Sequence, residues 1–216
     1  MIKTDASIFF DKFAVTFDTF YDGKRNALMQ LIDKNFRKDI FLRFTYTFDS
    51  FGNLKNKTLI DIGCGSGIYL LEALKRNAKH ITGLDPATEM LKLTEARLSR
   101  NGFIDKFRLI ESIFPATNLG KYDYAIVMGV MDYVKDPSTF LKELKNIISE
   151  ATCVSFPSKH WFRTPFRKFR YSLRKCPVYF YDENEIKNLA KSAGFSKVMI
   201  KKIQGAGMDY HVTLMP

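Results

Sequence analysis

The 216-residue sequence has few cysteines and no long apolar run. Its three cysteines, Cys64, Cys153 and Cys176, are widely spaced and form no CxxC pair, which disfavours both a disulfide framework and a zinc site. No apolar run reaches the roughly 18 residues that a membrane-spanning helix needs. The first residues, MIKTDASIFFDKF, carry acids where a signal peptide would not. We therefore expect a cytoplasmic protein without a bound metal.

Internal repeats, low-complexity tracts and linker-like Gly/Ser/Pro runs are also absent from the sequence. With 46% hydrophobic and 26% charged residues, the chain is long enough to bury one core. We therefore expect a single domain over residues 1–216. Aromatic and aliphatic residues at helical spacing over residues 5–50 predict two or three helices, which form an N-terminal helical cap over residues 1–50.

Positive charge, by contrast, is in excess. The formal net charge is +11, and residues 158–175, SKHWFRTPFRKFRYSLRK, hold seven Lys or Arg and five aromatics but no acid. Such a charge can attract nucleic acid, an anionic lipid surface or an acidic substrate. The choice among these partners depends on the fold that carries the stretch.

Short β-type runs alternate with helical stretches from residue 58 onward, at 58–62, 80–85, 107–112, 122–128 and 151–156. This alternation is typical of a parallel α/β sheet. Helix signals stand between the runs: Pro86 to Gly102, a helix opened by Asp136 and Pro137, and a capping box formed by Asp182 and Glu185. The last two runs, 196–204 and 209–216, flank GAG and predict an antiparallel hairpin.

The first run leads into a loop with three alternating glycines, Gly63, Gly65 and Gly67. A dinucleotide-binding loop would have a third glycine at position 68, where this chain has Ile68. Asp61 at the strand end favours a cationic amino group, and Asp85, 22 residues after Gly63, stands where an acid binds ribose hydroxyls. A ligand with a ribose, an ammonium group and no phosphate fits both acids. S-adenosylmethionine (SAM) is such a ligand.

The runs DIGCGSG, GLDPATEML and KYDYAIVMGVMDYVKDPSTFLKEL resemble the class I SAM-dependent methyltransferases, from about residue 40 to the last hairpin. The resemblance implies a Rossmann-like three-layer sandwich with a mostly parallel seven-stranded sheet that ends in an antiparallel hairpin. It also implies a set of residues around the methionine part of SAM and its ribose: Asp61, Gly63, Cys64, Gly65, Gly67 and Asp85. By the same likeness Pro86 and Met90 lie near the adenine, Met128 and Gly129 line the site after the fourth strand, and Tyr21 covers the methyl donor.

One position departs from the family pattern. Members of the family usually have an acid shortly after the third strand that binds the adenine amino group, and this chain has Ile113 there. We expect backbone groups of Ile113 or Phe114 to make the contact instead.

The segment after the fourth strand bears on the reaction. Enzymes that methylate nucleobase or glutamine amines often carry N/D-P-P-Y/F there, whereas this chain has MGVMDYV, and no Pro-Cys pair indicates cytosine C5 chemistry. Asp132, Tyr133 and His160 are the candidate catalytic residues, with His160 able to accept a hydroxyl proton near neutral pH. For each, a surface, covering or solvated role remains open.

Residues 157–181 form an insertion after the fifth strand, and Thr164 and Pro165 predict that a basic amphipathic helix begins inside it. We expect it to be a lid that contacts the acceptor through Trp161, Arg167, Arg170 and Tyr171. An anionic membrane contact, RNA binding and a plain packed helix remain open. The run VSFPSKHWFRTPFRKFRY is similar to magnesium-protoporphyrin O-methyltransferases. The expected function is O-methylation of a small or lipid-like, anionic or aromatic acceptor; the alternatives are a SAM-binding regulator without turnover and an RNA methyltransferase.

Overall fold

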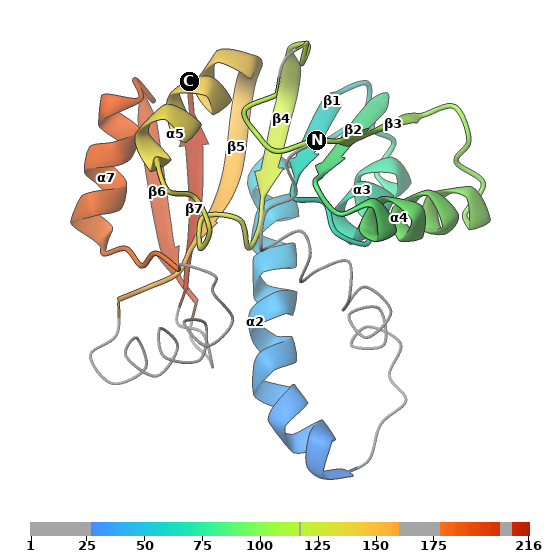
Figure 1. Ribbon diagram of the computed structural model, residues 1–216, viewed down its shortest axis with the longest axis horizontal. Coiled ribbons are helices and arrows are strands. Elements are labelled where there is room, and N and C mark those ends of the chain that lie inside the picture. The colour runs from blue at the N-terminus through green and yellow to red at the C-terminus, as the bar shows by residue number, and fades with distance from the viewer. Residues whose placement is uncertain (1–26, 117, 160–177, 204–208) are drawn as a thin grey trace.

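The computed structural model describes residues 27–116, 118–159, 178–203 and 209–216, with side chains from residue 39 onward. Figure 1 shows the helices around one sheet. In chain order the elements are α2 (Ala27–Phe51), β1 (Thr58–Ile62), α3 (Ile68–Lys75), β2 (His80–Asp85), α4 (Thr88–Arg100), β3 (Phe107–Glu111), β4 (Tyr122–Val127), α5 (Pro137–Ile147), β5 (Ile148–Phe156), α7 (Glu183–Ser192), β6 (Lys197–Lys202) and β7 (Tyr210–Met215).

The sheet has seven strands in the order β3-β2-β1-β4-β5-β7-β6. The first five pair in parallel, and β7 lies antiparallel between β5 and β6. This confirms the predicted Rossmann-like sheet with a terminal hairpin. Because β1, β2, β4 and β5 are parallel, their carboxyl ends meet at one edge, where ligands of such sheets bind. We call it the carboxyl edge and the opposite one the amino edge.

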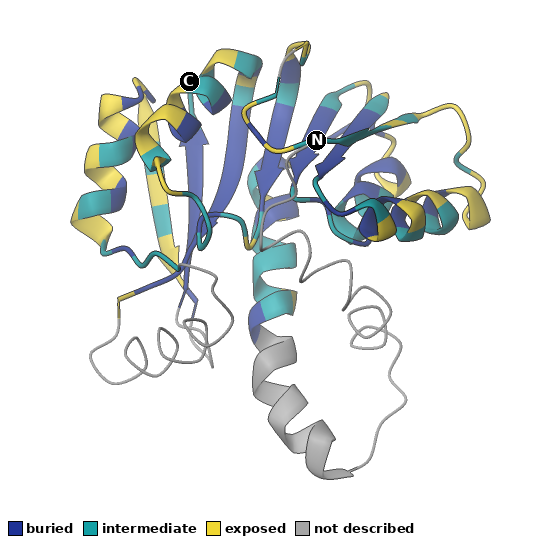
Figure 2. Cartoon of the chain, in the orientation of Figure 1, coloured by how far each residue is buried: buried dark blue, intermediate teal, exposed yellow. Residues whose placement is uncertain are grey.

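The residues on the two faces of the sheet form two apolar cores (Figure 2). Ile60, Ala125 and Val154 pack with residues of α5 and α7 on one face. Leu59 and Ile126 pack with residues of α2, α3 and α4 on the other. Side chains alternate between the two faces of a strand, so successive apolar residues pack into opposite cores. The central strands are therefore continuous hydrophobic runs in the sequence.

The helix signals are largely confirmed. Asp136 accepts a hydrogen bond from the Thr139 amide at 3.1 Å ahead of Pro137, and Asp182 and Glu185 form the reciprocal capping box. The helix expected to open at Pro86 begins at Thr88, because the Asp85 carboxylate holds the Ala87 amide and keeps Ala87 extended. The fifth strand also starts earlier than expected, at Ile148.

A polar seam joins α2 to β7. Its members lie on one side of α2 and at alternate positions along β7 and the residue before it. They are Arg43, Thr47 and Ser50 on the helix, His211 and Thr213 on the strand, and Asp209 just before the strand. Thr47 donates its hydroxyl proton to the Arg43 carbonyl at 2.8 Å, so its oxygen accepts from His211 Nε2 at 3.1 Å. Arg43 pairs with Asp209 at 2.9 Å. The seam fixes α2 where its first part extends past the carboxyl edge of the sheet (Figure 1).

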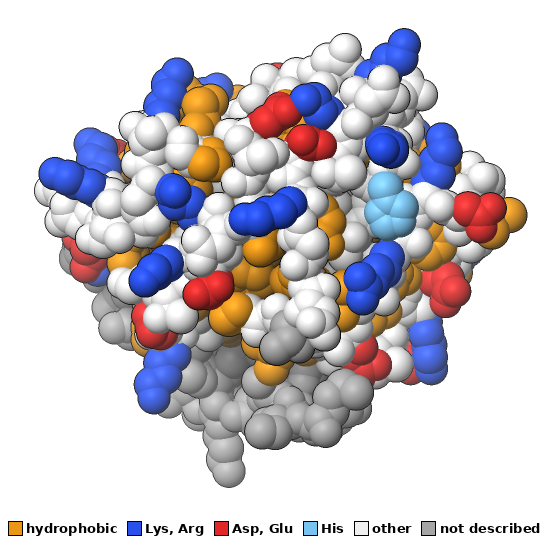
Figure 3. Space-filling model, turned by 90° about the horizontal axis from the view of Figure 1, so that it is seen from above, with side chains coloured by type: hydrophobic (Ala, Val, Ile, Leu, Met, Phe, Trp, Pro, Cys, Tyr) orange, Lys and Arg blue, Asp and Glu red, His pale blue; other side chains and the backbone are white. Residues whose placement is uncertain are grey.

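Basic side chains are not confined to the predicted lid. Figure 3 views the molecule from above, onto the amino edge, and shows Lys and Arg spread over this face with fewer Asp and Glu among them. Within the described residues, no helix is both long and apolar enough to cross a bilayer.

The seam gives a pH dependence of stability. Burial, followed by the charges of Lys201 and Arg43, lowers the pKa of His211 from 6.5 to about 4. A lowered folded-state pKa contributes stability above the unfolded pKa that is lost as the pH falls toward the folded pKa. We expect a loss on the order of 3 kcal/mol in the free energy of unfolding between pH 7 and pH 4 from this group. Urea unfolding of the wild type and His211→Gln across this range measures it; parallel stability curves would contradict the prediction.

Candidate cofactor site

The loop between β1 and α3 is shaped by its glycines. Gly63, Gly65 and Gly67 have φ angles of 74°, 52° and 75°, in the left-handed region that favours glycine. A Cβ at Gly63 would lie 2.4 Å from Val130 Cγ2, whereas at Gly65 it would meet no atom within 4 Å. The backbone at Gly65 is therefore accessible to a ligand from the carboxyl edge.

The loop is tied to the end of β2. The amides of Gly63 and Cys64 both donate to the Leu84 carbonyl, at 2.7 and 3.2 Å, and the Gly65 amide donates to Asp85 Oδ2 at 2.9 Å. The Cys64 side chain is buried in the core, where desolvation and then the Asp61 charge raise the pKa of its thiol. Cys64 can therefore contact a ligand only through its backbone groups.

Asp85 uses both of its carboxylate oxygens. Oδ1 accepts from the Ala87 amide at 2.9 Å while Oδ2 accepts from Gly65. Asp85 therefore fixes the loop from the position where the sequence predicts a ribose-binding acid.

Asp61 is the unusual group of the site. It is 1% exposed, and its Oδ2 atom has no hydrogen-bond partner in the structure. Desolvation, and then the charge of Asp85, raise the pKa of Asp61 well above its ordinary value. Leaving a buried carboxylate uncompensated is costly, and a cationic ligand group removes the cost.

The predicted adenine residues lie around the ends of β2 and β3. Met90 is buried with Ala87 in a small apolar cluster apart from the two main cores, and Pro86 is half-buried. Phe114 belongs to the core, with its ring 4.8 Å from that of Phe140. Ile113 is 44% exposed beside them, so it offers an apolar surface and backbone groups in place of the missing acid.

The loop after β4 reveals a residue that sequence reasoning missed. Gly129 has a φ of 74° and open space at its Cβ position, and its amide donates to Ser155 Oγ on β5 at 2.7 Å. Met128 lies partly buried beside the core. Ser155 is a polar residue near the carboxyl end of β5, between Val154 and Phe156, which was the signal available in the sequence.

The same loop contacts residues 179 and 181, which follow the predicted lid helix in the sequence. The Tyr179 amide donates to the Asp132 carbonyl at 2.9 Å, and the Tyr181 hydroxyl donates to the Met131 carbonyl at 3.3 Å. Asp132 and Tyr133 are both half-buried here, so the structure places these two candidate catalytic residues near the carboxyl edge. The other predicted site residues lie outside the described residues: Tyr21, His160, Trp161, Arg167, Arg170 and Tyr171.

The chain resembles known proteins both in sequence and in fold. A family model described as a methyltransferase domain matches residues 31–200. The chain belongs to this methyltransferase family. A ubiquinone biosynthesis O-methyltransferase of Nitrosomonas europaea is 28% identical over 183 residues, which cover 79% of this chain and 74% of that protein. Its Escherichia coli counterpart is 25% identical over 177 residues, with 79% and 73% covered.

Among solved structures, the magnesium protoporphyrin IX methyltransferase of Synechocystis with bound SAH has a similar fold, with a TM-score of 0.73. The likeness covers 98% of this chain and 99% of that one at 19% identity. The prediction of a class I SAM-dependent methyltransferase is thereby confirmed. The described residues fit the methyl donor, since Asp61 Oδ2 has no hydrogen-bond partner among them and an ammonium group would provide one, and the Asp85 carboxylate lies beside the glycine loop where the sequence predicts a ribose.

We expect the Asp61 carboxylate to lower the stability of the ligand-free protein and to strengthen the binding of SAM. Because its folded-state pKa is raised, the stability linked to its proton is present below the unfolded pKa and lost as the pH rises through the folded pKa. Asp61→Asn should therefore raise the melting temperature of the ligand-free methyltransferase at neutral pH. The same change should weaken SAM binding by roughly 10-fold to 100-fold, as expected for the loss of a charge-assisted hydrogen bond. Calorimetry with SAM and thermal unfolding without it measure the two effects.

The matched control is Asp105→Asn, an exposed carboxyl between α4 and β3, which should change neither quantity. Full SAM affinity in Asp61→Asn would refute the assignment of this carboxylate to the donor.

Proposed function

We propose that this methyltransferase transfers the methyl group of SAM to an oxygen atom of a small or lipid-like acceptor that is anionic or aromatic. Its relatives support this proposal. Two of them are O-methyltransferases of ubiquinone biosynthesis, and a structural neighbour is a magnesium protoporphyrin IX methyltransferase. The observation that carries it is the position of the lid root, where residues 157–159 and 178–181 meet beside the loop after β4.

The donor is held, in this proposal, along the carboxyl ends of β1, β2 and β4. Asp61 binds the ammonium group, Asp85 binds the ribose, and the remaining residues surround the methionine and adenine parts: Gly63, Cys64, Gly65, Gly67, Pro86, Met90, Ile113, Phe114, Met128 and Gly129. When bound there, SAM supplies an electrophilic methyl group at the carboxyl edge. Alignment of the acceptor oxygen with that methyl group provides much of the acceleration.

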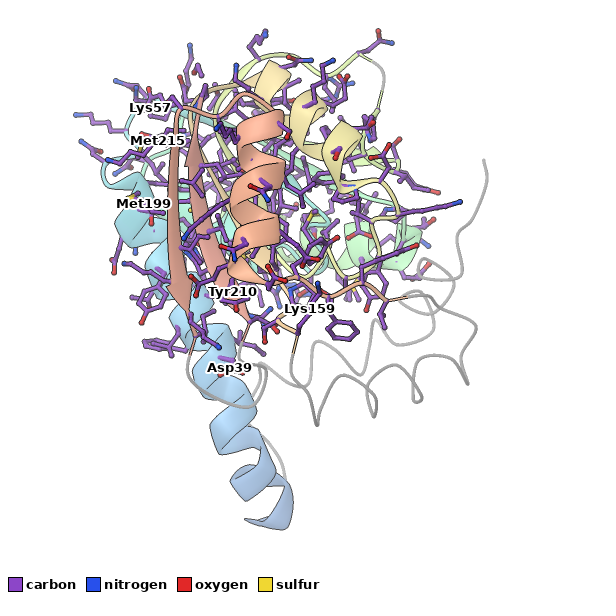
Figure 4. The ribbon with its side chains drawn as sticks, turned by 90° about the vertical axis from the view of Figure 1, so that its left-hand side faces the viewer. Asp39, Lys57, Lys159, Met199, Tyr210 and Met215 are labelled. Atoms are coloured by element: carbon purple, nitrogen blue, oxygen red, sulfur yellow. The ribbon has the colours of Figure 1, made fainter. Side chains whose placement is uncertain are left out.

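The lid root is a short paired segment. The Tyr181 amide donates to the Pro157 carbonyl at 2.8 Å, and the Lys159 amide donates to the Tyr181 carbonyl at 3.0 Å. The Lys159 ammonium group also pairs with Asp182 and Glu185 at the start of α7. In Figure 4 Lys159 lies with Tyr210 at the lower end of the molecule, away from Lys57 and Met215 at the amino edge. The basic and aromatic lid, residues 157–181, thus begins and ends on the side proposed for the acceptor.

A hydroxyl acceptor, such as a catechol, must lose its proton as the oxygen–carbon bond forms and the carbon–sulfur bond breaks, whereas a carboxylate acceptor is already ionised at neutral pH. We assign this proton to Asp132, with Tyr133 as a positioning residue and His160 as the alternative base. Tyr181 is unsuitable, because burial, and then the nearby Asp132 charge, raise its pKa to about 12 and keep it protonated at neutral pH. Its hydroxyl remains a donor to the Met131 carbonyl.

A turnover assay tests the proposal. We expect SAH to form with a prenylated catechol, a carboxylated tetrapyrrole or a fatty acid, and not with RNA transcripts. With the catechol as acceptor, Asp132→Asn should lower kcat by about 100-fold, the usual contribution of a general base, and leave the Kd of SAM unchanged. Asp136→Asn, four residues along the same loop at the cap of α5, is the matched control and should keep kcat. Transfer to RNA alone would contradict the acceptor class, and an unchanged kcat in Asp132→Asn would contradict its role.

A further inference from the structure

Two side chains on α4 hold the glycine loop from the side opposite Asp85. Thr94, which is fully buried, donates its hydroxyl proton to the Gly65 carbonyl at 2.7 Å. Arg97, one turn further along the helix, donates from Nη1 to Ser66 Oγ at 2.9 Å and also to the Ser66 carbonyl. The loop is therefore bound to the end of β2 through three amides, and to α4 through two carbonyls and the Ser66 hydroxyl.

The peptide groups on both sides of Gly65 are fixed by this arrangement. Its amide is held by Asp85 and its carbonyl by Thr94, while the space at its Cβ position is open. Glycine loses more backbone conformational entropy on ordering than any other residue. Without contacts that hold it, a loop of alternating glycines would become ordered only when the ligand binds, and this would weaken the binding free energy. The contacts with α4 order the loop before the ligand arrives.

The fit between loop and helix is also steric. A Cβ at Gly67 would lie 2.6 Å from Thr94 Cγ2 and 2.8 Å from its hydroxyl oxygen. The third glycine of the loop is thus needed for close approach to Thr94 as well as for its left-handed φ. Sequence reasoning assigned neither Thr94 nor Arg97 a role.

One helix consequently contacts both halves of the site. The first turn of α4 contains Met90, on the predicted adenine side. Its middle contains Thr94 and its last turn contains Arg97, and both hold the loop on the predicted methionine side. A helix is a rigid spacer with a rise of about 1.5 Å per residue. It therefore sets the distance between the two halves.

We propose that Thr94 and Arg97 are positioning residues for the cofactor: through α4 they hold the glycine loop in its binding conformation and in register with the adenine side. Neither residue needs to touch the ligand. The inference depends on the donor site and not on the identity of the acceptor, so it can fail or succeed independently of the proposed O-methylation.

The test compares SAH with 5′-methylthioadenosine, which has the adenine and ribose but lacks the amino acid portion. Thr94→Val keeps the volume and leaves the partly buried Gly65 carbonyl without the Thr94 donor, so the Kd of SAH should rise by about tenfold. The Kd of 5′-methylthioadenosine should change by less than about threefold, since the adenine side is intact. Thr94→Ser should restore the affinity for SAH.

Matched controls separate positioning from general destabilisation. Thr152→Val removes a buried hydroxyl that has no hydrogen-bond partner in the sheet, and it should leave both Kd values unchanged. Arg97→Gln should repeat the loss for SAH, whereas Arg100→Gln, on the exposed face of the same helix, should not. Arg97→Gln also keeps the test open if Thr94→Val does not fold.

Two results would overturn the proposal. One is unchanged SAH affinity in both Thr94→Val and Arg97→Gln. The other is an equal loss for SAH and 5′-methylthioadenosine, since that pattern marks a general loss of folding and not a loop out of register.

Discussion

The hydrogen bond from the Gly65 amide to the Asp85 carboxylate is the contact on which the donor site depends. It joins the loop after β1 to the end of β2, and the same carboxylate holds the Ala87 amide at the approach to α4. One side chain thus sets the loop, the end of the second strand and the start of the next helix. In the donor site that we propose, the same acid holds the loop and also binds the ribose.

A second carboxylate of the donor site, Asp61, is buried, and its Oδ2 atom has no hydrogen-bond partner among the described residues. Desolvation, and then the charge of Asp85, raise its pKa, so the ionised group destabilises the ligand-free protein. Two apolar cores, one on each face of the sheet, supply the stability against which this cost is set. The arrangement agrees with the general finding that binding sites concentrate unfavourable groups that the ligand then satisfies.

Local patterns were sufficient to predict the sheet, the glycine loop and Asp85, because strand, loop and helix signals lie within a few residues of one another. The missed contacts join distant segments. Thr94 meets Gly65 across 29 residues, Ser155 meets Gly129 across 26, and His211 meets Thr47 across 164. In the sequence Thr94 and Arg97 look like the polar face of an amphipathic helix, because only the packed fold shows which polar residues are buried. The prediction that a helix begins at Pro86 was wrong by two residues for a related reason. The Asp85 carboxylate accepts from the Ala87 amide and holds the backbone there in an extended conformation.

Hydrogen–deuterium exchange of the whole protein with and without SAH tests the central claim most directly, because it reports on the backbone of the site itself. The account predicts that SAH slows exchange over residues 61–67, 85–90, 112–114 and 128–129, with little change at the amino edge around residues 55–58 and 148–150. Protection confined to the amino edge, or absent from the glycine loop at saturating SAH, would contradict it.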